Sequence, residues 1–345
     1  MKTFKHFDAL DADMQLVIKH LLQFKAAPIE DLAPASARNN PTFKNAVDEI
    51  ASHSAMVRAM NVPAPVLPEK VDRIEHMIIP TRDGEVNARG YFPKSEECLL
   101  PVIVYFHGGG WVIADINTYE SSCRALCNAT CAIVISVGYR QAPENRFPVA
   151  ANDAYAAVQW VINNAAQFNG DSDRIAVAGE SAGGNLATVS CLMAKDEDGK
   201  MPLCQLLIYP VTDTSMLQPS YAENEDTQPL HASMMPWFFT HYLDDKINAL
   251  ERYAVPLQTD DDTGLPPAII TTAQFDPLRD EGEQYADKLR AAGVSVKSQR
   301  FDGVTHEFFG LSGSVAKAKQ ALKFAADALK EIFETAEKAA KLPNP

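Results

Sequence analysis

The motif that most clearly suggests a chemical reaction in this chain is Gly-Glu-Ser-Ala-Gly at residues 179–183. An apolar, partly β-branched run precedes it at 174–178, and a run of small residues compatible with a helix follows it at 186–194. A strand, a sharp turn and a helix in this order would place Ser181 at the apex of the turn. Its hydroxyl would then stand above a sheet, near the positive N-terminus of a helix, where it could serve as a nucleophile.

Three consecutive glycines at 108–110 form a second pattern, directly after a histidine and the apolar segment 102–106. Without side chains in the way, backbone N–H groups can turn into a cavity and bind a developing negative oxygen. We expect Gly109 and Gly110 to donate from this loop and Ala182 to donate from the residue after the serine. Taken alone, the glycines would also suit a flexible turn, but the serine motif favours the anion-binding interpretation.

These motifs resemble those of the hormone-sensitive-lipase-like branch (family IV) of the α/β-hydrolases. Further matches, from about residue 70 to 310 and in the family's order, lie at 139–144 (Tyr-Arg-Gln-Ala-Pro-Glu), 147–148, 153, 276–280 (Asp-Pro-Leu-Arg-Asp) and 303–306 (Gly-Val-Thr-His). Two residues depart from the pattern: Gln141 replaces a usually apolar residue, and Glu180 stands where Asp or Thr is commoner. The resemblance implies an α/β-hydrolase fold with a helical cap and a serine esterase activity.

A serine becomes a good nucleophile only when a base accepts its proton, so a histidine and an orienting carboxylate are required. In α/β-hydrolases both follow the serine, and the carboxylate comes first. Of the three histidines after Ser181, His306 follows the last predicted strand and a glycine-containing loop, which places it at the carboxyl edge of the sheet. His231 and His241 fall in an interruption of the strand–helix alternation, and their spacing fits no common metal site.

Three aspartates are candidates for the carboxylate. Asp276 directly follows a predicted strand and reaches the same edge of the sheet as His306. Asp280 would start the following helix, where it could cap that helix or brace the site, and Asp213 follows the preceding strand in a different loop. Asp276 is therefore the preferred partner of His306, holding its tautomer and stabilising its charged form.

Three other residues beside these groups are expected to support loops rather than to perform chemistry. His107 and Gly108 open the glycine loop, and Glu180 precedes the serine. His107 is interpreted as a loop anchor that hydrogen-bonds to backbone. No cofactor or metal is expected, and the acidic run at 260–262 suits a solvated loop better than a calcium site.

The expected reaction is hydrolysis of small esters with short-to-medium acyl chains through an acyl-enzyme intermediate. Two alternatives share the scaffold. Plant gibberellin receptors resemble this family and bind a hormone without turnover, having lost the catalytic histidine, so the presence of His306 favours an enzyme. An amidase or lactonase would use the same residues, because the choice of leaving group depends on pocket shape.

The composition excludes several partners. A net charge of −14 disfavours nucleic acid and anionic membranes, which would repel the protein. No run approaches the roughly 18 apolar residues of a membrane span, and the first 15 residues lack the apolar stretch of a signal peptide. We therefore expect a cytoplasmic protein with a small-molecule substrate. A homodimer is an option, because the family contains dimers.

The elements that would position these residues alternate between strands and helices. Strand-like runs occur at 72–79, 85–92, 101–106, 131–137, 174–179, 204–209, 267–273 and 294–301. Their alternation with helical stretches predicts an eight-stranded, mostly parallel sheet flanked by helices. The first two runs flank Arg82-Asp83-Gly84, a turn signal that predicts an antiparallel pair.

Amphipathic helices at 9–24 and 42–60 precede this alternation and are assigned to the cap, and a final helix is expected at 314–341. An insertion with Met234, Met235, Trp237, Phe238 and Phe239 interrupts the alternation, and one or two of these side chains are expected to line an acyl pocket. The predicted division is residues 1–68 (first part of the cap), 69–212 (first part of the core), 213–257 (cap insertion) and 258–345 (second part of the core).

Overall fold

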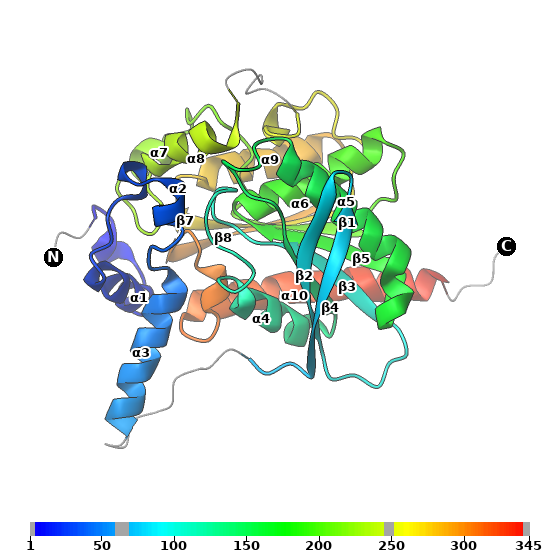
Figure 1. Cartoon of the computed structure of the whole chain (residues 1–345), viewed down its shortest axis with the longest axis horizontal. Coiled ribbons are helices and arrows are strands. Elements are labelled where there is room, and N and C mark those ends of the chain that lie inside the picture. The colour runs from blue at the N-terminus through cyan, green and yellow to red at the C-terminus, as the bar shows by residue number, and fades with distance from the viewer. Residues whose placement is uncertain (1–3, 59–68, 245–251, 341–345) are drawn as a thin grey trace.

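An eight-stranded sheet runs through the middle of the molecule (Figure 1). The computed structural model describes residues 4–58, 69–244 and 252–340. The strands are β1 (Arg73–Thr81), β2 (Gly84–Phe92), β3 (Leu100–Phe106), β4 (Ile133–Gly138), β5 (Gly170–Glu180), β6 (Cys204–Ile208), β7 (Ala268–Phe275) and β8 (Val296–Thr305). They lie in the order β1-β2-β4-β3-β5-β6-β7-β8.

The sheet is parallel except around β2, which is antiparallel to both β1 and β4. The β1–β2 hairpin closes with Thr81 opposite Gly84, as the turn signal predicts. All eight predicted strands are present, so the predicted α/β-hydrolase fold is confirmed. Because β3 and β5 to β8 are mutually parallel, the loops at their carboxyl ends meet at one edge of the sheet.

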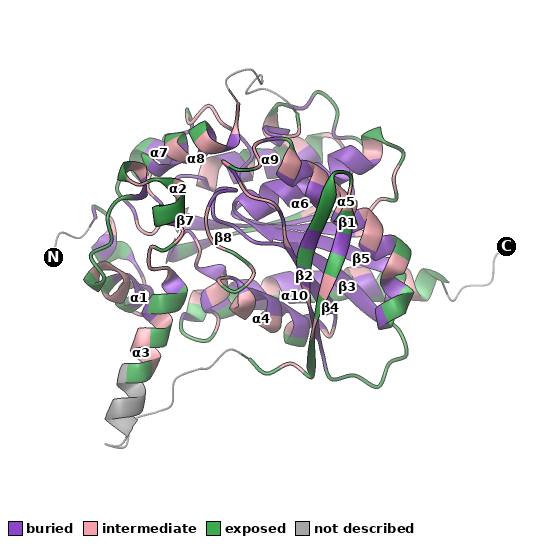
Figure 2. Ribbon diagram, in the orientation of Figure 1, coloured by how far each residue is buried: buried purple, intermediate pink, exposed green. Residues whose placement is uncertain are grey.

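Helices cover both faces of the sheet (Figure 1). They are α4 (Glu120–Thr130), α5 (Val149–Asn164), α6 (Ala182–Asp196), α9 (Arg279–Ala291) and α10 (Ala316–Ala340). Alternate strand residues divide between two apolar clusters: Val102 and Val104 of β3 pack with α5 and α6, whereas Ile103 and Tyr105 pack with α4 and α10. The central strands and the inner helix faces are therefore buried, whereas much of β1 and β2 and the outer helix faces are exposed (Figure 2).

Helices outside this alternation gather at one end of the molecule (Figure 1). They are α1 (Ala12–Gln23), α2 (Pro34–Ala37) and α3 (Phe43–Arg58) before the sheet, and α7 (Pro219–Glu223) and α8 (Met234–Tyr242) between β6 and β7. Trp237 Nε1 donates to Leu32 O at 3.1 Å, which ties the two groups together. The last two residues of the helix predicted at 42–60, and the division at residue 68, lie outside the described residues.

Short 3-10 helices connect these elements at Phe7–Ala9 (η1), Ile29–Asp31 (η2), Ala165–Phe168 (η3), Pro256–Gln258 (η4) and Phe309–Leu311 (η5). Across the ranges that the structure describes, no helix combines the length and apolar character needed to cross a bilayer.

Candidate active site

Ser181 lies between β5 and α6 with φ 58° and ψ −119°, a conformation that a non-glycine residue rarely adopts. The strand and helix cross so closely that a Cβ at Gly179 would overlap the backbone of Gly183. The strained turn is held by backbone hydrogen bonds: Ser181 N donates to Ile208 O at 2.9 Å, and Val211 N donates to Ser181 O at 3.2 Å. The sequence motif therefore forms a sharp turn with the serine at its apex.

Asp276 and His306 meet beyond the ends of β7 and β8. His306 Nδ1 donates to Asp276 Oδ2 at 2.7 Å, and both side chains are buried. Asp276 Oδ1 accepts a hydrogen bond from Leu278 N at 2.9 Å, and Asn224 Nδ2 donates to Asp276 O at 3.3 Å. These contacts fix the carboxylate and present one oxygen to the imidazole. Ring orientation and tautomer follow from that bond.

The other two candidate carboxylates face different partners. Asp280 Oδ2 accepts from Ser220 N at 2.8 Å. Asp213 accepts from the side chains of Ser215, Gln218 and Gln258. Within the described residues, Asp276 is the one of the three aspartates that accepts a hydrogen bond from His306.

The charge state of His306 depends on two opposing effects. Burial disfavours the imidazolium and lowers its pKa, whereas the Asp276 carboxylate raises it by charge attraction and hydrogen bonding. Glu307 and Glu180 act in the same direction as Asp276. The balance places the pKa of His306 above its ordinary value of 6.5. The imidazole is therefore a stronger base than a free histidine.

Tyr209, which directly follows β6, packs against the His306 ring with 4.6 Å between ring centroids. Its hydroxyl donates to Glu180, and the Tyr105 hydroxyl donates to the other oxygen of the same carboxylate. Burial raises the pKa of Glu180 against the opposing effect of these hydroxyls. Glu180 thus holds the ring that contacts the imidazole. Sequence reasoning missed Tyr209, although its place at the end of a strand beside the site was a usable signal.

The glycine loop follows β3 in an unusual conformation. Gly109 and Gly110 have φ angles of 98° and 57°, values that favour glycine. Gly109 O accepts from Val112 N at 3.0 Å and from Ile113 N at 2.9 Å, closing the loop into a tight turn. As the first residue of α6, Ala182 has an N–H that the helix itself leaves unpaired.

His107, the predicted loop anchor, and Gly108, also expected to support the loop, are both buried. His107 Nδ1 donates to Gly108 O at 2.7 Å, and its ring stacks on Tyr139 with 4.4 Å between centroids. Burial lowers the pKa of His107 to about 4, so the ring is neutral near pH 7. At Gly108 a Cβ would overlap the Tyr119 hydroxyl, so a side chain there would force Tyr119 to move.

A cavity open to solvent joins the serine, the histidine and the glycine loop, with about 1290 Å³ of space when the open solvent is included. Its wall includes Ser181, His306, Gly109 and Gly110. The segments at 21–42 and 228–238 form much of the remaining wall. They contribute the apolar side chains Leu21, Leu22, Ile29, Leu230, Met234 and Phe238. Of the five apolar residues singled out in the insertion, Met234 and Phe238 line this cavity.

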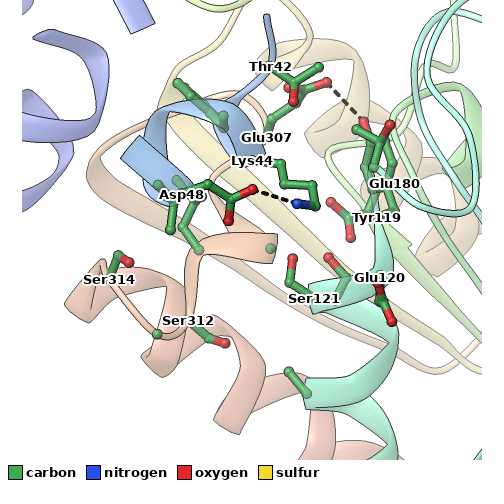
Figure 3. A pocket seen from close by; sticks show the side chains of 18 of the residues that line it. Thr42, Lys44, Asp48, Tyr119, Glu120, Ser121, Glu180, Glu307, Ser312 and Ser314 are labelled. Atoms are coloured by element: carbon green, nitrogen blue, oxygen red, sulfur yellow. Dashed lines mark hydrogen bonds and ion pairs between the residues drawn. The ribbon is translucent and has the colours of Figure 1, made fainter. Parts of the chain in front are cut away.

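A second cavity, with about 910 Å³ of space when open solvent is included, shares lining residues with the first. Both cavities are lined by Thr42, Thr118 and Glu307. Figure 3 shows Glu307 pointing toward Tyr119, whose hydroxyl donates to Glu307 Oε1 at 2.9 Å. Glu307 therefore stands between the two spaces. Within the described residues, no group of three or more His, Cys, Asp or Glu side chains is arranged to hold a metal ion.

A sequence profile of the α/β-hydrolase fold matches residues 103–310, and the chain belongs to this family. The hormone-sensitive-lipase-like branch indicated by the motifs is confirmed. Carboxylesterase NlhH of Mycobacterium tuberculosis is 38% identical over 298 residues, which cover 85% of this chain and 92% of the relative. Ethyl acetate hydrolase of Pseudomonas putida is 34% identical over 267 residues, covering 76% and 84%.

Solved structures agree with these relatives. A hyperthermophilic esterase from the archaeon Pyrobaculum calidifontis superposes with a TM-score of 0.78 at 36% identity, covering 91% of this chain and 97% of the other. A thermostable esterase from Pseudomonas putida ECU1011 gives a TM-score of 0.82 at 35% identity, covering 94% and 98%. The solved structures therefore match more than nine tenths of the chain.

Proposed function

We propose that this carboxylesterase cleaves small esters with short-to-medium acyl chains, using Ser181 as nucleophile, His306 as base and Asp276 as the orienting carboxylate. The observation that carries the proposal is the cavity shared by Ser181, His306 and the glycine loop, with Asp276 bonded to the far nitrogen of the imidazole. This is the arrangement that acyl transfer to a serine requires.

The reaction follows from these positions. His306 accepts the proton of Ser181 as the serine oxygen attacks the ester carbonyl. The carbonyl oxygen becomes negative and accepts hydrogen bonds from the N–H groups of Gly109, Gly110 and Ala182. Protonated His306 then gives its proton to the leaving alcohol, and a water molecule activated by the same imidazole releases the acid. Asp276 stabilises the positive charge on the ring throughout.

The acyl group would lie against the apolar wall contributed by residues 21–42 and 228–238. We assign these segments to a cap, divided between residues 1–68 and 213–257, which covers the cavity. Met234 and Phe238 support this assignment, because both side chains face the cavity while they are anchored in α8. A wall of this kind selects acyl chains by apolar contact and length.

Hydrolysis of aryl esters of increasing acyl length tests the substrate assignment. We expect kcat/KM to be highest among acetyl to octanoyl esters. It should fall for a palmitoyl ester, because the acyl chain is longer than the confined apolar wall. The matching anilide should react far more slowly, because an amide carbonyl is less electrophilic than an ester carbonyl and an aniline leaves less readily than a phenol. Preference for the anilide, or for a lactone over every open-chain ester, would contradict the esterase assignment.

The pH dependence follows from the direction of the His306 pKa shift. Only neutral imidazole can accept the serine proton, and Asp276 raises the pKa of His306 above 6.5. We therefore expect kcat/KM to fall as the pH decreases, with the midpoint above 6.5 rather than at it. A pH–rate profile on a neutral ester measures this midpoint. An unchanged rate from about pH 8 to about pH 5 would contradict His306 as the base.

A further inference from the structure

The loop that carries the proposed oxyanion donors holds an unfavourable conformation beyond its glycines. Trp111 and Ala114 have φ angles of 62° and 63°, in the left-handed region that costs a non-glycine residue energy. Such residues keep this conformation only when their surroundings hold them. The contacts that hold residues 111–114 therefore determine where the N–H groups of Gly109 and Gly110 point.

Arg38, which directly follows α2, makes one of these contacts from far outside the loop. Its Nε donates to Val112 O at 2.8 Å, and its Nη2 donates to Ala142 O at 2.8 Å. The outer edge of the guanidinium binds Glu144 through two hydrogen bonds of 2.8 Å and 2.6 Å. Arg38 thus joins three segments that are distant in sequence, and it lies in the wall of the catalytic cavity.

The other carbonyl groups of the loop are held from the same side. Ala142 N donates to Trp111 O at 3.0 Å. Gln141 Nε2 donates to Ile113 O at 2.8 Å and to Ala114 O at 3.0 Å. Every carbonyl from residue 111 to residue 114 therefore has a partner from Arg38 or from the segment 141–142. Both backbone polar groups of Val112 are bonded: its oxygen accepts from Arg38, and its N–H donates to Gly109 O.

We propose that Arg38 is a positioning residue for the oxyanion hole. By fixing Val112 O, it sets the turn that aims the N–H groups of Gly109 and Gly110 at the substrate oxygen, an inference that rests on the proposed catalytic role of those two residues. Arginine suits this task because its planar, five-donor fork can bind a carboxylate along one edge and two carbonyls with its remaining donors. A lysine retains the charge but cannot make these four bonds at once.

The test compares Arg38→Ala, Arg38→Lys and Glu144→Gln with Arg174→Ala. Arg174 is a matched control because it also binds a carboxylate and a backbone carbonyl, those of Asp171 and Leu99, at the start of β5. With an aryl acetate at a temperature where each variant is folded by circular dichroism, we expect kcat to fall about 10- to 100-fold in both Arg38 variants. KM should change less than about threefold, because ground-state binding does not need the aligned donors. The kcat of Glu144→Gln should lie between the kcat of Arg38→Lys and that of the wild type.

Two further readouts separate positioning from general structural support. Inactivation by an aryl phosphonate should slow in proportion to kcat, because its phosphoryl oxygen occupies the same donors. Ethylguanidinium should restore part of the activity of Arg38→Ala and leave the activity of Arg174→Ala unchanged. A kcat within threefold of wild type in folded Arg38→Lys, or a loss confined to KM, would overturn the proposal. Absence of esterase activity in the wild-type chain would instead overturn the proposed function.

Discussion

Replacing Ser181 with alanine is expected to lower kcat by about 10⁴- to 10⁶-fold and to abolish stoichiometric labelling by an organophosphate. In the proposed mechanism the hydroxyl forms the bond to the acyl group, and no other part of the site can take over that role. The residual rate should still exceed that of water, because the N–H groups of Gly109, Gly110 and Ala182 can still stabilise the oxyanion. The turn itself should survive, since it is held by the backbone bonds of residue 181 to Ile208 and Val211.

Ser190→Ala provides the matched control, because it makes the same substitution at another buried serine, in the helix that follows Ser181. Ser190 Oγ donates to Ala187 O at 2.7 Å, a local bond away from the cavity wall. This variant should keep both activity and labelling. Mass spectrometry of the labelled protein and measurement of kcat distinguish the Ser181→Ala variant from the Ser190→Ala control. Persistent one-to-one labelling of Ser181→Ala would mean that another residue is the nucleophile.

The parts of the site that the sequence made predictable are those encoded by local chain geometry. Gly179 and Gly183 flank the serine because strand and helix cross there without room for a Cβ. A histidine after the last strand and an aspartate after the preceding one reach a common edge because parallel strands end together. Each inference needs only element type, element order and one stereochemical rule, so a single sequence is sufficient.

Other parts depend on contacts that no local pattern encodes. Arg38 lies 106 residues from Glu144, and nothing in the short stretch around it indicates a carbonyl partner at Val112. Tyr209 contacts His306 across the ends of two strands that are not neighbours in the sheet. Trp111 stacks on Tyr242 of α8, with ring centroids 4.2 Å apart, across a distance of more than a hundred residues in the chain. The pairings of Arg38 and Trp111 follow from how the segments outside the sheet pack, which helical periodicity does not specify.

Gln141 shows how a departure from a family pattern can acquire a physical meaning. The sequence alone marked it as polar at a usually apolar position. The structure shows its amide bonded to Ile113 O and Ala114 O, so the polar group is satisfied rather than merely tolerated. Glu180 is similar, because a longer acid beside the serine reaches the hydroxyls of both Tyr105 and Tyr209.

Replacing Asp276 with asparagine should lower kcat by about 10⁴-fold while leaving the fold intact. The reason lies in the two oxygens of the carboxylate. Asparagine can keep its carbonyl toward Leu278 N, where Oδ1 accepts a bond at 2.9 Å, but it then presents an NH₂ group to His306. That donor requires an unprotonated Nδ1, so the imidazole must carry its proton on Nε2. The nitrogen that should accept the serine proton is then occupied.

Asp276→Asn should also shift the pH profile, because the attraction that raises the pKa of His306 is removed. With that attraction gone, burial lowers the pKa, and the residual activity should persist to lower pH than in the wild type. Asp213→Asn is the control, since Asp213 is a neighbouring buried aspartate bonded to Gln218 and Gln258 rather than to His306. Measured per folded molecule, its kcat should stay within about tenfold of wild type, because no triad contact is changed. The assignment of Asp276 as the orienting carboxylate would be wrong if Asp213→Asn lost as much kcat as Asp276→Asn and if the pH midpoint of Asp276→Asn were the same as in the wild type.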